Sequence, residues 1–218
     1  MTGLRRIGAP KVAMLLAALV FALPGLDWSP TDHCELFAGE MAITRAELEA
    51  GRRAVAFDVR YDSLFMNFNG DCGYCHAIYQ VLRLIPGGGL MIAPVCSSWI
   101  FMSRGSTKRS KYNARGNPSA PSVQQGNLMA ARTAILLYLA AARGVWFVLE
   151  QPSGSLFQEH PRIQQLLRIL KLRKKLIHML DFGGFSSKPT WLYSSPATSY
   201  LSINSFGDPT TEALQPHA

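Results

Sequence analysis

Four residues with chemically useful groups each follow a short apolar run in this chain. They are the glycine Gly39, the carboxylic acids Asp58 and Glu150, and the thiol Cys96. Ligands of open α/β sheets bind where parallel strands end, so apolar runs that form such strands would bring these residues to one edge. A thiol and a carboxylic acid at that edge are suited to covalent chemistry, because a thiolate is a nucleophile and a carboxyl group exchanges protons.

The turn at residues 35–39 (ELFAG) and the acid Asp58 predict a nucleoside site. About 20 residues separate Gly39 from Asp58, the length of a turn, helix and strand that brings an acid to a ribose held over the first turn. Phe37, Ala38 and Gly39 form the end of that turn, and a glycine lets the backbone approach a ligand closely. No further glycines of a dinucleotide fingerprint follow, so S-adenosylmethionine fits better than a dinucleotide.

Three further positions complete the predicted site, each with a simpler alternative. Asp71 follows a Gly70 turn and could face an adenine amino group, or have no role in the site. Cys96 lies in residues 93–98 (APVCSS), where partial exposure would favour a reactive thiol, or it is a buried inert cysteine. Glu150 follows the apolar residues 145–149, where burial would raise the pKa of its carboxyl group, or it caps the next loop.

At 218 residues the chain is long enough for one α/β domain with its own core. We expect an apolar leader at residues 1–30, the domain at residues 31–195 and a flexible tail at residues 196–218. Short apolar segments alternate with helical patterns, which indicates βαβ units and a mostly parallel, Rossmann-like sheet flanked by helices. The expected strands are residues 33–38, 53–58, 64–68, 90–93, 145–149, 176–182 and 190–193, and the expected helices are residues 41–50, 74–84, 123–142 and 161–175.

Together these segments resemble the cytosine-5 DNA methyltransferases and, more broadly, the S-adenosylmethionine-dependent methyltransferases with a Rossmann-like sheet. ELFAG resembles their first motif, APVCSS their Pro-Cys loop, and LEQP at residues 149–152 their Glu-Asn-Val strand end. The resemblance implies that Cys96 adds to carbon 6 of cytosine and that Glu150 holds and protonates ring nitrogen 3, while carbon 5 takes the methyl group. It assigns the cofactor S-adenosylmethionine to Phe37, Ala38, Gly39, Asp58, Asp71 and Pro94.

The same segments depart from that family's pattern. Val95 stands where the proline before the nucleophile belongs, Ser97 replaces a glutamine, and Gln151 and Pro152 replace Asn-Val. The segment after Glu150 is also too short for the usual target-recognition domain. These departures favour a second hypothesis, a catalytically inactive methyltransferase-like module that binds nucleic acid.

Basic residues indicate a polyanionic partner. The formal net charge is +8, which favours nucleic acid through long-range attraction, and the resemblance implies DNA more than RNA. One group of basic residues follows Cys96 and is interleaved with aromatic residues, a composition suited to phosphate contact and base stacking, or to a solvated lid. This group comprises Lys108, Arg109, Lys111 and Arg115. A second basic group, expected on one helix, comprises Arg162, Arg168, Lys171, Arg173, Lys174 and Lys175.

The N-terminal leader does not decide in which cellular compartment the protein is located. Arg5, Arg6 and Lys11 precede an uncharged stretch, residues 12–26, as in a secretory signal, a membrane anchor or an extra helix packed on the domain. An intracellular location, in nucleus or cytoplasm, is favoured because S-adenosylmethionine is harder to supply outside the cell. Membrane contact through the leader stays an alternative.

The cysteines suggest a third hypothesis, an exported haem or thiol protein. Cys72, Cys75 and His76 spell a haem-attachment motif, although they open an expected helix that leaves little room for a porphyrin. Zinc would lack an evident fourth ligand there, so we expect no metal. The chain's four cysteines are too sparse for a disulfide framework, and we expect reduced thiols.

Overall fold

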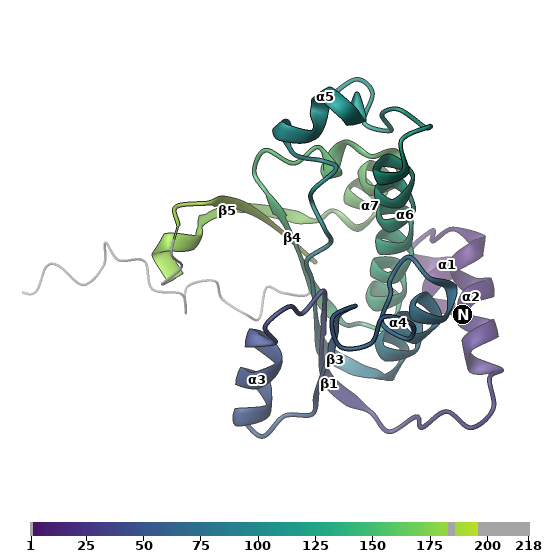
Figure 1. Cartoon of the computed structure of the whole chain (residues 1–218). Helices are drawn as coiled ribbons and strands as arrows, with labels where there is room; N and C mark the ends of the chain where they lie inside the picture. The colour runs from purple at the N-terminus through teal and green to yellow at the C-terminus, as the bar shows by residue number, and fades with distance from the viewer. Residues whose placement is uncertain (1, 183–185, 196–218) are drawn as a thin grey trace, which may run out of the picture.

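The computed structural model describes residues 2–182 and 186–195. Within this part of the chain, six strands form a sheet in the order β2-β1-β3-β4-β6-β5. The strands are β1 (Thr31–Leu36), β2 (Ala54–Phe57), β3 (Leu84–Ile92), β4 (Trp146–Pro152), β5 (Arg173–His178) and β6 (Pro189–Ser194). Strands β1 to β4 pair in parallel, whereas β6 runs antiparallel to both β4 and β5. The expected α/β class with a mostly parallel, Rossmann-like sheet is confirmed (Figure 1).

Helices cover the two faces of the sheet unequally. The short helix α3 lies on one face beside β1 and β2, and the helices α4, α6 and α7 lie on the other (Figure 1). These helices are α3 (Ala42–Glu49), α4 (Asp71–Arg83), α6 (Pro121–Ala142) and α7 (Pro161–Leu170). The core lies between the sheet and the α4–α6–α7 layer. Its completely buried strand side chains include Cys34, Leu36, Leu90, Ile92, Phe147 and Leu149, which alternate along their strands as a sheet's period of two requires.

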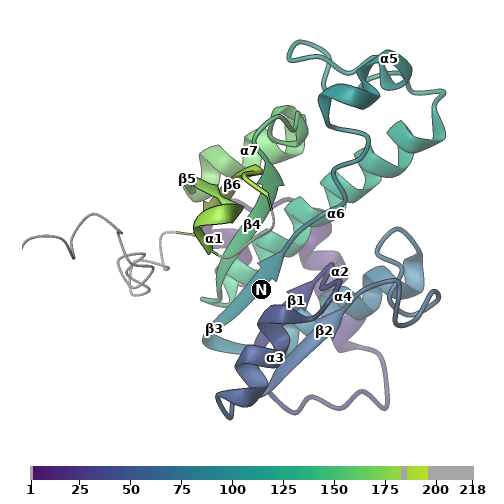
Figure 2. The ribbon, with the colours of Figure 1, turned by 60° about the vertical axis from the view of Figure 1, so that its left-hand side comes forward.

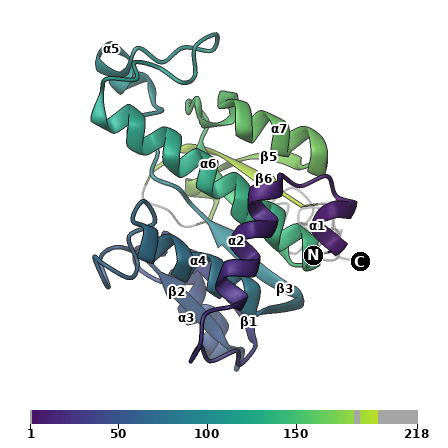
Figure 3. The same cartoon turned by 90° about the vertical axis from the view of Figure 1, so that its right-hand side faces the viewer.

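The leader packs on the domain as two helices, α1 (Thr2–Arg6) and α2 (Lys11–Phe21), which lie outside α4 and α6 (Figure 3). Ala13, Ala17 and Val20 form its buried face. The ring of Phe21 stacks on Trp28 with centroids 4.9 Å apart, which fixes the end of α2. The structure therefore has the packing-helix arrangement. No helix among the described residues combines the length and apolar character needed to cross a membrane.

The strand expected at residues 64–68 is wrong, because this segment forms turns. Asp62 accepts hydrogen bonds from the backbone N–H groups of Leu64 and Phe65 at 2.9 and 2.8 Å. Asn67 likewise accepts one from Asn69 at 3.1 Å. Side chains that bond nearby backbone groups offer the chain an alternative to a strand ladder, and this local alternative prevails here.

The helix expected to reach residue 175 is also wrong, since α7 ends at Leu170. Lys171 adopts a left-handed conformation with φ 49°, which stops the helix. Strand β5 then begins at Arg173 and pairs with β6, and residues Met179–Phe182 form a 3₁₀ helix instead of the rest of a strand. The second basic group is therefore divided between α7 and the edge strand β5. The expected tail at residues 196–218 lies outside the described residues.

Short helices also occur where a loop was expected. The segment between β3 and α6 contains a 3₁₀ helix at Phe101–Ser103 and the helix α5 (Arg104–Thr107), and it projects away from the sheet (Figure 2). A further 3₁₀ helix, Phe157–Glu159, precedes α7.

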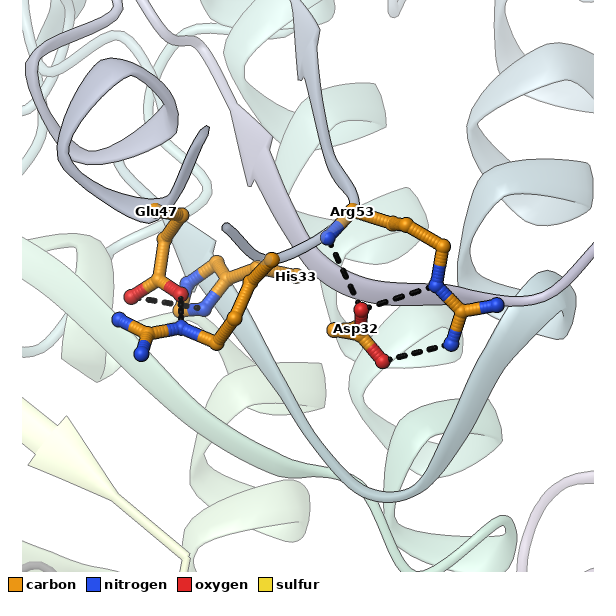
Figure 4. Close-up of polar contacts among 5 residues, drawn as sticks. Asp32, His33, Glu47 and Arg53 are labelled. Atoms are coloured by element: carbon orange, nitrogen blue, oxygen red, sulfur yellow. Dashed lines mark hydrogen bonds and ion pairs between the residues drawn. The ribbon is translucent and has the colours of Figure 1, made fainter. Parts of the chain in front are cut away.

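Charged side chains tie β1 to its neighbours at the amino ends of the parallel strands, opposite the edge where their carboxyl ends lie (Figure 4). Asp32 accepts hydrogen bonds from the backbone N–H and the guanidinium of Arg53 at 2.8–3.0 Å, which lowers the pKa of its carboxyl group to about 2. His33 Nδ1 lies 3.6 Å from Glu47, and burial lowers the pKa of His33. The His33 ring meets Trp146 edge to face with centroids 5.2 Å apart, across the small residue Gly89.

Replacing Gly89 with alanine is expected to reduce the free energy of unfolding by about 1–3 kcal/mol, the usual cost of overfilling a packed site. The added methyl group would overlap the Trp146 ring and lie 2.7 Å from the His33 ring. Urea unfolding measures the change. Gly154→Ala is the matched control, because nothing lies within 4 Å of its Cβ position. Equal stability of the two variants would contradict this packing.

Candidate active site at the carboxyl ends of the strands

The parallel pairing of the four strands ends in register, although β4 continues to Pro152 beside β6. Leu36 is paired with Phe57 on one side and Ile92 on the other, and Ile92 is paired with Leu149. The residues directly after these four are Phe37, Asp58, Ala93 and Glu150. The structure thus brings the segments that contain the predicted site residues to one edge of the sheet (Figure 2).

A cavity of about 380 Å³ lies at this edge. Its lining includes Phe37 and Gly39 after β1, Asp58 after β2, and Ala93 and Val95 after β3. The strand order reverses between β1 and β3, which is the place where open α/β sheets bind ligands. The volume falls in the range of about 300–1,000 Å³ that is usual for small-molecule sites.

Asp58 holds the two turns beside the cavity together. Its Oδ2 accepts a hydrogen bond from the Gly39 backbone N–H at 3.0 Å, and its Oδ1 accepts one from the Arg60 N–H at 2.9 Å. The side chain is 12% exposed, with Arg60 Nε 3.7 Å away. Each carboxylate oxygen keeps a second lone pair, so Asp58 can also accept hydrogen bonds from a ligand.

The turn after β1 has an unusual backbone. Gly39 has φ 54°, and a Cβ there would lie 2.7 Å from Arg60 Nη2, so the position favours glycine. Phe37 and Met41 also have positive φ angles, 62° and 58°. Such strained residues cluster at ligand sites, where the surrounding structure holds them in place.

Three of the expected cofactor residues, Ala38, Asp71 and Pro94, lie outside the cavity lining. Asp71 is 94% exposed, and its carboxylate pairs with Arg132 at 2.6 Å. Pro94 is buried, and its carbonyl accepts a hydrogen bond from Gln151 Nε2 at 2.7 Å. Asp71 therefore fixes the start of α4 in this structure, and Pro94 joins the loop after β3 to β4.

The sequence missed several residues that do line the cavity. They come from the turns after β2 and before α4 and from α6: Val59, Arg60, Met66, Asn67, Phe68, Asn69 and Met129. Asn69 and Gly70 indicated a turn, but nothing in their spacing placed that turn against β1. Its position follows from Arg132 of α6, which donates hydrogen bonds to the carbonyl groups of Phe68 and Gly70 at 3.0 and 2.9 Å.

Cys96 follows β3, whereas Glu150 lies within the neighbouring strand β4, just past the last residue that pairs with β3. The Cys96 thiol is half-buried, and the adjacent Val95 lines the cavity. The Pro94–Gln151 hydrogen bond holds the Cys96 loop against β4, next to Glu150. Burial raises the pKa of Glu150, while Lys188 Nζ, 3.7 Å away, opposes that shift without cancelling it. A partly accessible thiol and a carboxyl group that retains its proton more readily than usual therefore share this edge.

The basic segment after Cys96 divides into an exposed part and a buried anchor. Lys108, Lys111 and Arg115 are exposed. Arg109, in contrast, is only 2% exposed. Its expected place on the phosphate-binding surface is therefore wrong. Its guanidinium stacks 3.4 Å from the Trp99 ring centroid and donates hydrogen bonds to α6, through Asn127 at 2.9 Å and the Val123 carbonyl at 3.2 Å. Arg109 anchors the segment instead, and burial lowers its pKa to about 10.

His160 packs against the same anchor. Its ring meets Trp99 edge to face, with centroids 5.8 Å apart, and it is 5% exposed. Burial, with smaller contributions from nearby arginines that include Arg109, lowers the pKa of His160 to about 4. The residue is therefore neutral in the folded protein at neutral pH.

The Cys72–Cys75–His76 motif opens α4. Both nitrogen atoms of the His76 ring are engaged, Nδ1 with the Phe65 carbonyl at 2.8 Å and Nε2 with Gln80 at 2.7 Å. Neither is available to bind a haem iron in this arrangement. Across residues 2–182 and 186–195, no group of three or more His, Cys, Asp or Glu side chains is placed to hold a metal ion.

No protein-family model matches this chain, and no curated protein matches it. Its chemistry must therefore be inferred from the residues and their geometry.

Because His160 is buried in its neutral form, acid is expected to weaken the packing of the Trp99–Arg109 anchor. The unfolded chain binds a proton at the ordinary histidine pKa near 6.5, and the folded chain does so only near 4. The stability is therefore complete above pH about 6.5 and falls as the pH is lowered between these values. In urea unfolding across this range, His160→Gln should lose less stability with falling pH than the parent. His178→Gln, on the exposed strand β5, should keep the parent's pH dependence; a parent slope in His160→Gln would refute the assignment.

Proposed function

We propose that the chain is an S-adenosylmethionine-dependent methyltransferase that acts on a nucleic-acid base, with carbon 5 of cytosine as the target. The observation that carries this proposal is the cavity where the strand order reverses, with the backbone of Gly39 bonded to the Asp58 carboxylate of the facing turn. The fold class of the chain, a mostly parallel α/β sheet, is compatible with the proposal.

The residues around the cavity fit a small nucleoside. Asp58, which accepts a hydrogen bond from the Gly39 backbone, offers its remaining carboxylate lone pairs to the hydroxyl groups of a ribose. Phe37 and Phe68, whose ring centroids lie 4.8 Å apart, provide an apolar wall for an adenine. S-adenosylmethionine, when bound, supplies the methyl group that carbon 5 accepts.

Cys96 is the proposed nucleophile. Carbon 5 of cytosine reacts poorly with an electrophile until a thiolate adds to carbon 6. Addition forms a bond between Cys96 Sγ and carbon 6, and the electron pair of the ring double bond moves through carbon 5 toward ring nitrogen 3. After carbon 5 has been methylated, its original proton leaves and the thiolate is expelled, which restores the ring.

Glu150 is the proposed partner of ring nitrogen 3. The electron pair that reaches this nitrogen during addition is neutralised by a proton, which Glu150 donates and later takes back. Burial raises its pKa, which favours the protonated form that this role requires.

The exposed residues of the segment after Cys96 are the proposed nucleic-acid contacts. Lys108, Lys111 and Arg115 offer positive charge to phosphates, and the aromatic rings of Tyr112 and Phe101 are 97% and 75% exposed. Exposed rings among basic residues are suited to stacking on bases.

A second candidate function is a nucleic-acid-binding module without catalysis. The Glu150–Lys188 pair favours it, because an ammonium 3.7 Å away stabilises the ionised carboxylate, which cannot donate a proton. Val95 before the cysteine favours it as well, since the resemblance leads one to expect proline there.

Asp58→Asn should weaken S-adenosylmethionine binding roughly tenfold or more, since hydrogen bonds to a charged group are worth about 1.5–3 kcal/mol. The measurement is calorimetric titration of the purified chain. Glu49→Gln, the same type of change on the exposed surface of α3, should bind as the parent does. Equal affinity of Asp58→Asn and the parent, or no binding by the parent, would rule out the cofactor assignment.

With S-adenosylmethionine present, Cys96→Ser should abolish covalent trapping on DNA that contains 5-fluorocytosine, because after methylation of carbon 5 the fluorine cannot leave as a proton does and the thiol adduct persists. A denaturing gel of the protein with labelled DNA detects the adduct. Cys75→Ser, which changes an exposed thiol on α4, should still be trapped. If the parent binds this DNA but forms no adduct, the non-catalytic module is the correct function.

A further inference from the structure

Two exposed thiols stand together on α4, outside the proposed active site. Cys72 and Cys75 lie in the first turns of this helix, and both are exposed and free. The residues between them face inward: Gly73 and Tyr74 are buried. The two thiols therefore lie on one accessible face of α4.

Their spacing permits a bond between them. Residues three apart on an α-helix have Cα atoms about 5 Å apart from helix geometry, within the range of about 4.4–6.8 Å that disulfides span. Their Cβ atoms, normally about 5–6 Å apart, must approach to about 3.5–4.5 Å. A disulfide is thus reachable, but only if the first turns of α4 move.

We propose that Cys72 and Cys75 form a reversible dithiol–disulfide site that reacts with low-molecular-weight disulfides such as oxidised glutathione. One cysteine thiolate attacks the small disulfide, which gives a mixed disulfide and expels one glutathione thiolate. The second cysteine thiolate attacks the protein sulfur of that mixed disulfide and expels the other. Both cysteines are oxidised, the small disulfide is reduced to two thiols, and the protons of the cysteines end on these thiols.

This site is joined directly to the wall of the cavity. Gly73 packs on the backbone of Asn67, where an added Cβ would lie 2.7 Å from the Asn67 nitrogen and closer still to its carbonyl. Tyr74 contacts Phe68 edge to face, with centroids 5.6 Å apart. Asn67 and Phe68 line the cavity. A bridge that shifts the first turns of α4 must therefore disturb this wall, whatever ligand the cavity takes.

The test equilibrates the full chain with reduced and oxidised glutathione at graded ratios, alkylates the remaining thiols and identifies the peptides by mass. We expect Cys72 and Cys75 to disappear together from the alkylated pool as an internal disulfide, and to return when reduced glutathione is restored. In Cys72→Ser and Cys75→Ser, the remaining thiol should instead carry one glutathione. Separate glutathione adducts on both cysteines of the parent, a bridge to Cys96, or no reaction would overturn the proposal.

Hydrogen exchange tests the connection to the cavity without any ligand. The amides of Asn69 and Gly70, which bond to Asn67, should exchange faster in the oxidised parent than in the reduced parent. Oxidant should leave them unchanged in Cys72→Ser. Equal exchange in both redox states of the parent would show that the disulfide does not reach the cavity wall.

Discussion

The carboxylate of Asp58 is the contact on which the site depends. It is fixed at the end of β2, yet it accepts a hydrogen bond from the backbone of Gly39 after β1 and another from Arg60 in its own turn. Hydrogen bonds to a charged acceptor are stronger than neutral ones, and this one connects turns 19 residues apart in the chain. The resulting frame positions the strained turn after β1 and leaves the carboxylate on the cavity surface.

The strand ends could be predicted because parallel strands must finish at a common edge. Apolar runs indicated strand ends at residues 38, 58, 93 and 149, and the parallel pairing ends in register within two residues of them, at Leu36, Phe57, Ile92 and Leu149. Gly39 and Asp58 were recognised from their spacing, which reflects the length of one strand–helix–strand unit.

Other features depend on contacts that a single sequence does not show. Asp71 looked like a cofactor residue, but Arg132, 61 positions later, pairs with it at the start of α4. Arg109 looked like a surface residue, yet it is buried against Trp99 and α6. Its neighbours Lys108 and Lys111 are exposed, so composition alone could not separate the anchor from the basic surface.

The region after Glu150 was the least predictable for a different reason. Basic residues and leucines continue beyond Leu170 with a helical appearance, but Lys171 turns left-handed and the chain enters β5. There Lys174 lies 3.9 Å from the Trp191 ring centroid on the neighbouring strand. This cross-strand contact and the pairing with β6 determine the local structure more strongly than helix propensity does.

A crystal structure of the chain with S-adenosylhomocysteine tests the central claim most directly. The account predicts that the nucleoside occupies the cavity at the ends of β1, β2 and β3, with its ribose hydroxyl groups bonded to the Asp58 carboxylate. A nucleoside found at another edge of the sheet, or in the cavity without contact to Asp58, would contradict the account.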